Sequence, residues 1–420
     1  MNSQRHHTSP AFEQQAAASY NLGNSFKDQG RFDEAIEHLQ KAISLNPNFA
    51  QAHSDLGIVF ARQGDMNRAA ASFRQSLALK PNFADAHSHL GSALKLQGKL
   101  DEAEACYREA LALMPDFAEA HGHLGSVLKE QGRLDDAVTC YRKALALRPD
   151  FAEAHNDLGL VYAHQGKPDE AASCYRKALA LRPDFAAAHS NQAVTFQIQG
   201  RPDEAIACYQ KALAYKPDDA HAHSNLLLSM QYSATHTPEN LFAAHGRFAA
   251  QFETPLKPRW LAHPNPREPR KRLKIGYVSP DFHKHPVADS IEPVLARHDK
   301  SQVEIFCYYN HVHVDAVTQR LQALADHWVS CKYLSDDALA ERIRADGIDI
   351  LVDLAGHTGS NRLLAFARKP APVQLTYLGY PCTTGLSAID YRITDAYAEP
   401  PGLTEQFNVE QLWRLPESFC

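Results

Sequence analysis

Apolar and polar positions repeat every 34 residues between about residue 14 and residue 227. Within each period, apolar residues fall at i, i+3, i+4 and i+7 in two separate segments, which predicts two amphipathic helices. A Gln-Gly step ends the first segment and a proline follows the second, so the chain is expected to turn at both places. The first helix carries, at one repeated position, Leu22, Leu56, Leu90, Leu124, Leu158, Gln192 and Leu226.

Small and large residues also alternate with this period. Gly91 and Ala103 are small, for example, and Tyr107 is large, as expected where two helices approach closely and a bulky side chain fills the space between them. One hairpin cannot bury its apolar face alone, so the hairpins must stack. The pattern resembles the tetratricopeptide repeat, with histidine at a usually aromatic position. We expect an all-α tetratricopeptide superhelix over 14–232, preceded by a disordered tail over 1–13.

The pattern changes after the repeats. A helix is expected to start near Pro238, and a proline-rich linker follows, so 233–272 is interpreted as a connecting region. From Leu273 onward, short apolar runs alternate with helical patterns, which predicts an α/β Rossmann-like lobe over 273–420. The predicted strands are Leu273–Ser279, Val303–Tyr309, Asp349–Leu354, Val373–Tyr377 and Tyr391–Thr394.

Three polar loops rich in glycine or proline follow predicted strands: Ser279–Pro286, Gly356–Asn361 and Gly379–Gly385. In parallel sheets the functional loops leave the carboxyl ends of the strands, so a site is expected there. Asp353, inside an apolar strand, is interpreted as a structural residue that accepts hydrogen bonds from a neighbouring loop.

Charge and hydropathy exclude some classes of protein. The net charge is −6 and charged residues make up 22% of the chain, which does not suggest binding to nucleic acid or to a membrane surface. No apolar run approaches the length that spans a bilayer, and the N-terminal residues lack the apolar core of a signal peptide. We therefore expect a cytoplasmic protein.

Three long sequence segments of the lobe carry a resemblance to a known family: KIGYVSPDFHKHPV (274–287), DGIDILVDLAGHTGSNRL (346–363) and RKPAPVQLTYLGYPCTTG (368–385). They resemble the N-terminal catalytic lobe of the protein O-GlcNAc transferase family, which includes the SPINDLY-type transferases. Tetratricopeptide repeats joined to this lobe are the usual arrangement of that family. The resemblance implies a GT-B glycosyltransferase that moves GlcNAc from UDP-GlcNAc to Ser or Thr of a protein, inverts the anomeric centre and uses no metal or other cofactor.

The resemblance also implies site residues. The family's active-site histidine, in its His-Pro motif, corresponds to His285. Substrate-binding positions correspond to His357, Thr358, Tyr380 and Pro381. The pair His283-x-His285 has metal-ligand spacing, but no further ligand follows at a suitable distance, so no metal site is predicted.

In this family a ladder of asparagines on the concave face of the repeats binds the main chain of the acceptor. An Asn amide donates and accepts at once, so it pairs with any peptide unit. Asn21, Asn191 and Asn225 match the ladder and are predicted to bind an acceptor protein or peptide. The four positions between Asn21 and Asn191 carry Asp55, His89, His123 and Asp157 instead.

The resemblance stops at residues 415–420, near the junction where the family's second lobe begins. We therefore expect the lobe that binds the nucleotide sugar to lie outside this chain, and the chain alone to be inactive if no separate lobe is supplied. Two alternatives stay open: a non-catalytic tetratricopeptide scaffold, and transfer of fucose from GDP-fucose in the SPINDLY manner.

Overall fold

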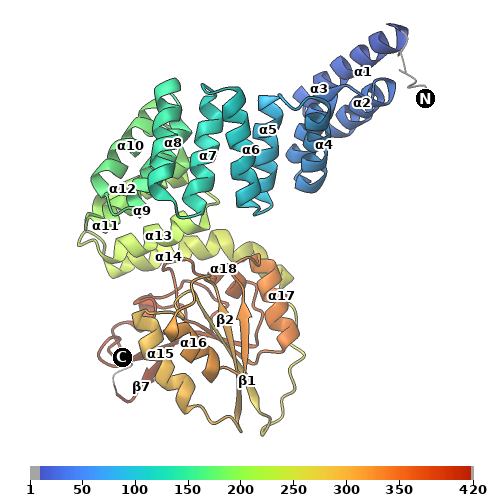
Figure 1. The fold of residues 1–420 in the computed structure, drawn as a ribbon. Helices are drawn as coiled ribbons and strands as arrows, with labels where there is room; N and C mark the ends of the chain where they lie inside the picture. Colours follow the sequence, from blue (N-terminus) through green and yellow to red (C-terminus); the bar gives the residue numbers. More distant parts are fainter. Residues whose placement is uncertain (1–9, 418–420) are drawn as a thin grey trace. The chain divides into compact units, whose positions relative to one another are not determined.

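Helical hairpins with the predicted period make up the first part of the chain (Figure 1). The computed structural model describes residues 10–417, which divide into two units between Asn191 and Gln192. The first unit contains the helices α1 (Pro10–Asp28), α2 (Phe32–Leu45), α3 (Ala50–Arg62), α4 (Met66–Leu79), α5 (Ala84–Leu96), α6 (Leu100–Leu113), α7 (Ala118–Glu130), α8 (Leu134–Leu147), α9 (Ala152–His164) and α10 (Pro168–Leu181).

Helix α1 starts earlier than the sequence suggested. It begins at Pro10, inside the range 1–13 that was predicted to be a disordered tail, and residues 1–9 lie outside the described residues. Proline suits the first helical position because its missing N–H would have no partner there. The following alanine-rich segment continues the helix, and Ala16 is already buried.

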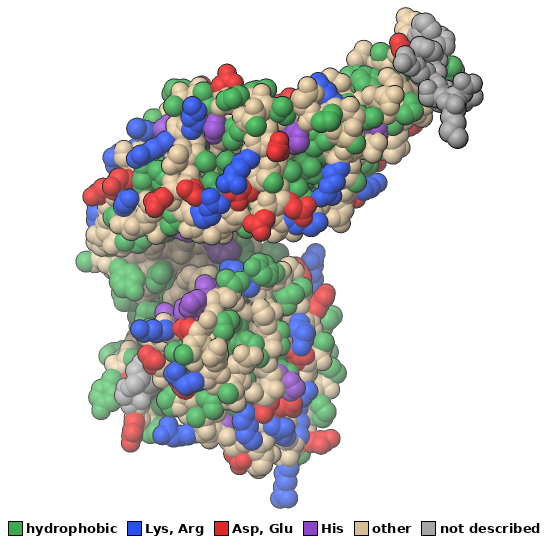
Figure 2. Space-filling view, viewed as in Figure 1, with side chains coloured by type: hydrophobic (Ala, Val, Ile, Leu, Met, Phe, Trp, Pro, Cys, Tyr) green, Lys and Arg blue, Asp and Glu red, His purple; other side chains and the backbone are tan. Residues whose placement is uncertain are grey.

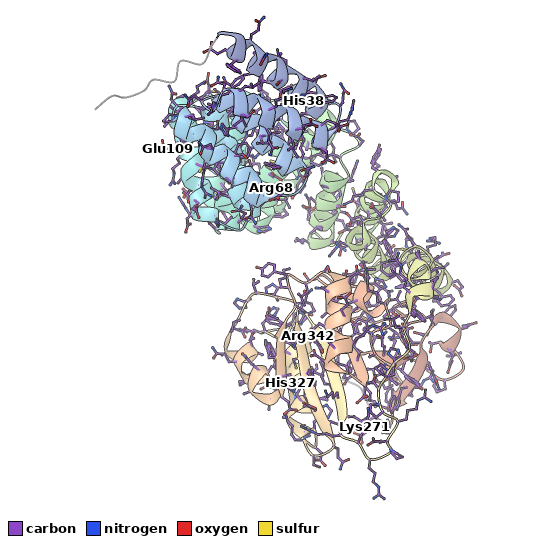
Figure 3. All side chains as sticks on the ribbon, turned by 90° about the vertical axis from the view of Figure 1, so that its right-hand side faces the viewer. His38, Arg68, Glu109, Lys271, His327 and Arg342 are labelled. Carbon is purple, nitrogen blue, oxygen red and sulfur yellow. The ribbon has the colours of Figure 1, made fainter. Side chains whose placement is uncertain are left out.

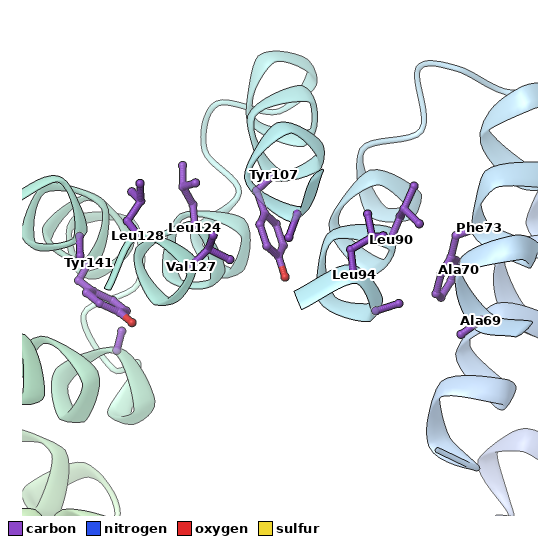
Figure 4. Close-up of a cluster of buried hydrophobic side chains, with 14 of the residues drawn as sticks. Ala69, Ala70, Phe73, Leu90, Leu94, Tyr107, Leu124, Val127, Leu128 and Tyr141 are labelled. Carbon is purple, nitrogen blue, oxygen red and sulfur yellow. The ribbon is translucent and has the colours of Figure 1, made fainter. Parts of the chain in front are cut away.

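The packing inside each hairpin follows the predicted alternation of small and large residues. A Cβ atom added to Gly91 would lie 2.9 Å from the Tyr107 ring, so only glycine lets α5 approach α6 this closely. Tyr107 and Tyr141 are buried among Leu90, Leu124 and other apolar side chains (Figure 4). The turn glycines of the Gln-Gly steps have positive φ, as at Gly98 (76°).

The repeated histidine has a local structural role. In five successive repeats its Nε2 donates to the carbonyl oxygen of the proline six residues earlier, as in His87 to Pro81 (2.8 Å). This bond ties the start of one hairpin to the loop that ends the preceding one. The imidazole therefore stabilises the link between neighbouring repeats.

The second unit contains the last repeat helices and the lobe, and α11 spans the division between the units. Its elements are α11 (Ala186–Ile198), α12 (Pro202–Tyr215), α13 (Ala220–Gln231), α14 (Pro238–Phe252), η1 (Thr254–Arg259), β1 (Leu273–Ser279), α15 (Pro286–Arg297), β2 (Val303–Tyr309), α16 (Ala316–Leu324), β3 (His327–Ser330), α17 (Asp336–Asp346), β4 (Ile350–Asp353), α18 (Leu363–Phe366), β5 (Val373–Thr376), β6 (Tyr391–Asp395), η2 (Glu405–Phe407) and β7 (Gln411–Leu415).

The lobe is built on a parallel seven-stranded sheet with strand order β3-β2-β1-β4-β5-β6-β7. All five predicted strands are present, and the predicted fold class, repeats followed by an α/β Rossmann-like lobe, is confirmed. Two strands were missed. β3 has only four residues and β7 lies at an edge with Trp413 half exposed, so neither shows the apolar run of a buried strand. Helix α15 was also missed, and it contains an internal proline, Pro293.

The last repeat helices belong to the core of the second unit. Leu227 in α13 and Phe248 in α14 are buried in one apolar cluster with Phe366 and Leu386 of the lobe. This packing explains why the units divide at 191/192, whereas the sequence suggested boundaries at 232/233 and 272/273. Within the described residues, no helix combines the length and apolar character needed to cross a bilayer.

Candidate functional site

The strand order places a switch point between β1 and β4. The chain runs outward from β1 through β2 to β3 on one side and from β4 through β5 to β7 on the other. Ligands of such sheets bind at the carboxyl ends of the strands beside this point, because the loops diverge there. The loops after β1 and β4 flank the switch point, and the loop after β5 is next to them.

The loop after β1 carries His285, which is the N-cap of α15. Its Nδ1 accepts a hydrogen bond from the backbone N–H of Val287 (3.2 Å), and its side chain is 40% exposed. In a neutral ring Nε2 then carries the proton. Nε2 of this tautomer is therefore a hydrogen-bond donor and not a proton acceptor.

Three further histidines lie near His285, and the sequence interpretation did not assign them to a site with it. The ring of His283 lies 5.9 Å from that of His285, 5.3 Å from His311 and 5.8 Å from His313, measured between centroids. Asp281 lies 3.9 Å from Nδ1 of His285, and burial raises the pKa of this carboxyl. Figure 2 shows histidine side chains gathered on the surface of the lobe.

A signal for this group was present in the sequence. His311-x-His313 follows the predicted strand Val303–Tyr309 just as His283-x-His285 follows Leu273–Ser279. Because these strands are parallel neighbours, their carboxyl ends bring the two pairs together. Within residues 10–417, no group of three or more His, Cys, Asp or Glu side chains is placed to hold a metal ion.

His311 is expected to titrate below its ordinary pKa of 6.5. Burial lowers its pKa first, and the charges of His283, Lys332 and His313 act in the same direction. A titration of the histidine ring protons by NMR measures this midpoint, and His283→Gln should move it toward 6.5. A midpoint at or above 6.5 for wild-type His311 would contradict the described geometry.

Asp353 holds the start of the loop after β4, as the sequence suggested. Its carboxylate accepts hydrogen bonds from the backbone N–H of Gly356 (2.8 Å) and Ala355 (3.2 Å) and from the Thr376 hydroxyl (2.8 Å). Asp353 is fully buried, and burial raises its pKa to about 6. This residue shapes the start of the loop and does not face a ligand.

His357, in the same loop, lies inside the packing of the second unit. Its side chain is completely buried, and both ring nitrogens are engaged, with the Ser224 hydroxyl (3.1 Å) and the Thr384 carbonyl (2.9 Å). Burial lowers its pKa well below 6.5. In the described structure these contacts hold the loop after β4, and the binding of substrate by His357 stays a prediction.

Tyr380 is buried as well, and its binding of substrate also stays a prediction, whereas Thr358 and Pro381 lie nearer the surface. Tyr380 is 5% exposed, and its hydroxyl contacts Nε2 of His245 (2.9 Å). Thr358 is half-buried and donates to the Ala355 carbonyl (2.8 Å). Pro381 is exposed, and the binding of substrate by Thr358 and Pro381 stays a prediction.

The asparagine ladder is not a continuous row of free amides. Asn21 is exposed on α1, but Asn191 donates to Asn156 (2.9 Å). Between them, Asp55 is bound by Lys27 (2.6 Å) and Tyr20. Asn225, in the second unit, is half-buried on α13. Peptide binding by the three predicted asparagines stays a prediction. The visible surface of the repeats carries charges of both signs, interspersed (Figure 2).

Comparison with known families identifies both parts of the chain. Residues 217–420 match the model described as Glycosyl transferase family 41, and residues 3–226 match a tetratricopeptide model described as Cilia and flagella-associated protein 70 C-terminal domain. A solved structure of a Thermobaculum terrenum O-GlcNAc transferase mutant is 36% identical with a TM-score of 0.66, covering 72% of this chain and 58% of that chain.

Curated relatives agree with these matches. The probable UDP-N-acetylglucosamine–peptide N-acetylglucosaminyltransferase SPINDLY of Arabidopsis thaliana is 41% identical over 197 residues, which are 46% of this chain and 21% of that protein. The UDP-N-acetylglucosamine–peptide N-acetylglucosaminyltransferase of Caenorhabditis elegans is 40% identical over 152 residues, 36% of this chain and 13% of that protein. The chain thus spans about a fifth or less of the length of these relatives.

These findings confirm the resemblance to the O-GlcNAc transferase family. Residues 217–420 are similar to glycosyl transferase family 41, and in this chain they are joined to tetratricopeptide repeats.

Proposed function

We propose that this protein takes part in the transfer of GlcNAc from UDP-GlcNAc to Ser or Thr hydroxyls of a protein that its repeats hold. The proposal is supported by the match of residues 217–420 to family 41 and by the names of the relatives. The observation that carries it is the position of His285: an exposed imidazole at the carboxyl end of β1, beside the switch point.

The chemistry sets what the site must do. The acceptor hydroxyl oxygen forms a bond to the anomeric carbon, the bond from that carbon to the phosphate oxygen breaks, UDP leaves with the electron pair of that bond, and the hydroxyl proton passes to solvent. The Nε2–H of His285 donates to an oxygen of the bound substrates and so orients them, a contribution that depends on a pre-arranged donor.

A transfer assay tests the proposal. The protein, together with the lobe that binds the nucleotide sugar, is incubated with an acceptor protein and either UDP-GlcNAc or GDP-fucose, each labelled in the sugar. We expect label from UDP-GlcNAc on Ser or Thr residues of the acceptor. Label only from GDP-fucose would show the SPINDLY-type alternative, and binding of the acceptor without transfer from either donor would favour the scaffold.

A further inference from the structure

Two helices at the end of the repeats hold the loops after β4 and β5. Ser224 and Gln231 of α13 and His245 of α14 contact His357 and Tyr380 of these loops, and we call these five residues the α13–α14 clasp. All except Gln231 are buried, and the His245 and His357 rings lie 5.2 Å apart. Sequence patterns gave no sign of His245, which lies in the middle of an ordinary helix.

The hydrogen bonds of His245 have a definite direction. Its Nδ1 contacts the Leu241 carbonyl oxygen (2.7 Å), which only accepts, so Nδ1 carries the proton. In the neutral ring Nε2 must then accept, and the Tyr380 hydroxyl is its donor (2.9 Å). The Tyr380 oxygen accepts in turn from the Gln231 amide (3.3 Å). Replacing the Nε2 acceptor therefore leaves the proton of the buried Tyr380 hydroxyl without an acceptor, although the Gln231 amide still donates to its oxygen.

Helix α14 and its C-cap also contact the end of the loop after β5. A Cβ atom added to Gly385 would lie 2.6 Å from the His245 carbonyl oxygen, so the end of the loop packs directly on the helix backbone. Further along, the buried carboxylate of Glu253 accepts from the Ala388 N–H (2.7 Å) and from the Ser387 hydroxyl (2.9 Å). At the beginning of the loop the contacts are those of Tyr380 with α13 and α14 and a hydrogen bond from Arg392 to the Pro381 carbonyl oxygen (2.8 Å).

We propose that His245 is a positioning residue: by accepting from Tyr380 it fixes the loop Gly379–Gly385 at the edge of the candidate site, so that the last repeat helices complete this edge. The interpretation of this loop as part of a transferase site rests on the proposed function. The position of the loop, which the contacts above define, does not depend on that function.

Two substitutions of His245 separate the hydrogen bond that Nε2 accepts from Tyr380 from the one that Nδ1 donates to Leu241. His245→Gln keeps an acceptor near the place of Nε2, and His245→Asn keeps a donor near the place of Nδ1. Hydrogen exchange of the backbone amides in Gly379–Gly385 is measured in the whole protein. We expect exchange at least about tenfold faster in His245→Asn, because the Tyr380 hydroxyl loses its acceptor, and close to wild type in His245→Gln.

Tyr380→Phe removes the same hydrogen bond and leaves the imidazole in place. This variant therefore still tests the role of the hydrogen bond if His245→Asn fails to fold. It should raise exchange of the loop to the same extent as His245→Asn, and the double variant should add nothing further. Gly246→Ala, in the same helix with nothing within 4 Å of the added Cβ, serves as the control.

Equal protection of the loop in all variants, or equal loss in His245→Gln and His245→Asn, would overturn the proposal. Failure of the proposed function has a different signature, since wild-type protein would then transfer no sugar although the exchange pattern holds. If transfer is observed, its kcat/KM should fall with His245→Asn and be retained with His245→Gln.

Discussion

The contribution of His245 to the free energy of unfolding is expected to fall by about 3 kcal/mol between pH 7 and pH 4. Burial lowers the pKa of His245 from 6.5 to about 4 in the folded protein. Between these values the unfolded chain binds a proton that the folded chain does not bind, so stability decreases as the pH falls. The contribution is complete above pH 6.5 and is lost through this window.

The change has to be isolated from other titrating groups. Asp353 acts in the opposite direction, because burial raises its pKa to about 6, so the folded state gains a proton first as the pH falls. Comparing wild type with His245→Gln cancels Asp353 and His357, which both proteins share. The stability advantage of wild type over this variant should therefore shrink by the stated amount on going from pH 7 to pH 4.

Tryptophan fluorescence during denaturant unfolding suits this measurement. The three tryptophans, Trp260, Trp328 and Trp413, all lie in the second unit, so the signal reports the unfolding of the unit that contains His245. A stability difference between the two proteins that stays constant from pH 7 to pH 4 would contradict the buried, neutral His245 on which the α13–α14 clasp depends.

Replacing Gly379 by alanine is expected to destabilise the second unit by about 3 kcal/mol. An added Cβ would lie 2.1 Å from the Leu354 carbonyl oxygen and 2.9 Å from the Ala355 Cα atom. These are backbone atoms, so no side-chain rotation relieves the contact. The loops after β4 and β5 would have to separate, and Tyr380 would move with the second of them.

Gly359→Ala is the matched control for this substitution. Gly359 lies in the loop after β4, where an added Cβ meets nothing within 4 Å, and its stability should stay within about 0.5 kcal/mol of wild type. Denaturant unfolding followed by tryptophan fluorescence compares the two variants. A Gly379→Ala protein as stable as Gly359→Ala would show that the two loops are not packed as described.

Periodicity and resemblance predicted the larger features of the molecule because these depend on many residues at once. The 34-residue repeat specifies every hairpin, and the apolar run Val303–Tyr309 gives a buried strand with the same bounds in the structure. The exposed four-residue strand β3 contains no such pattern. The division of the chain inside α11 could not be predicted either, because it depends on packing of Leu227 and Phe248 against the lobe, far away in sequence.

For the site, the sequence indicated which loops carry candidate residues but not which way their side chains point. His285 lies in a long motif, and the structure places it in the loop at the carboxyl end of β1, where its side chain is 40% exposed. His357 and Tyr380 also lie in motifs, but a motif does not reveal whether a side chain points to solvent or into the packing, and here α13 and α14 cover them. His245 carries no motif, so only its contacts show its importance.

Sugar transfer beside His285 is tested directly by comparing two histidine substitutions. His285→Gln is compared with His327→Gln, which alters another part-exposed histidine, at the start of the edge strand β3 (Figure 3). In the transfer assay with UDP-GlcNAc, we expect kcat/KM to fall about a hundredfold for His285→Gln, because a donor to the reacting substrates is displaced, and to stay near wild type for His327→Gln. Equal activity of the two variants would contradict the account.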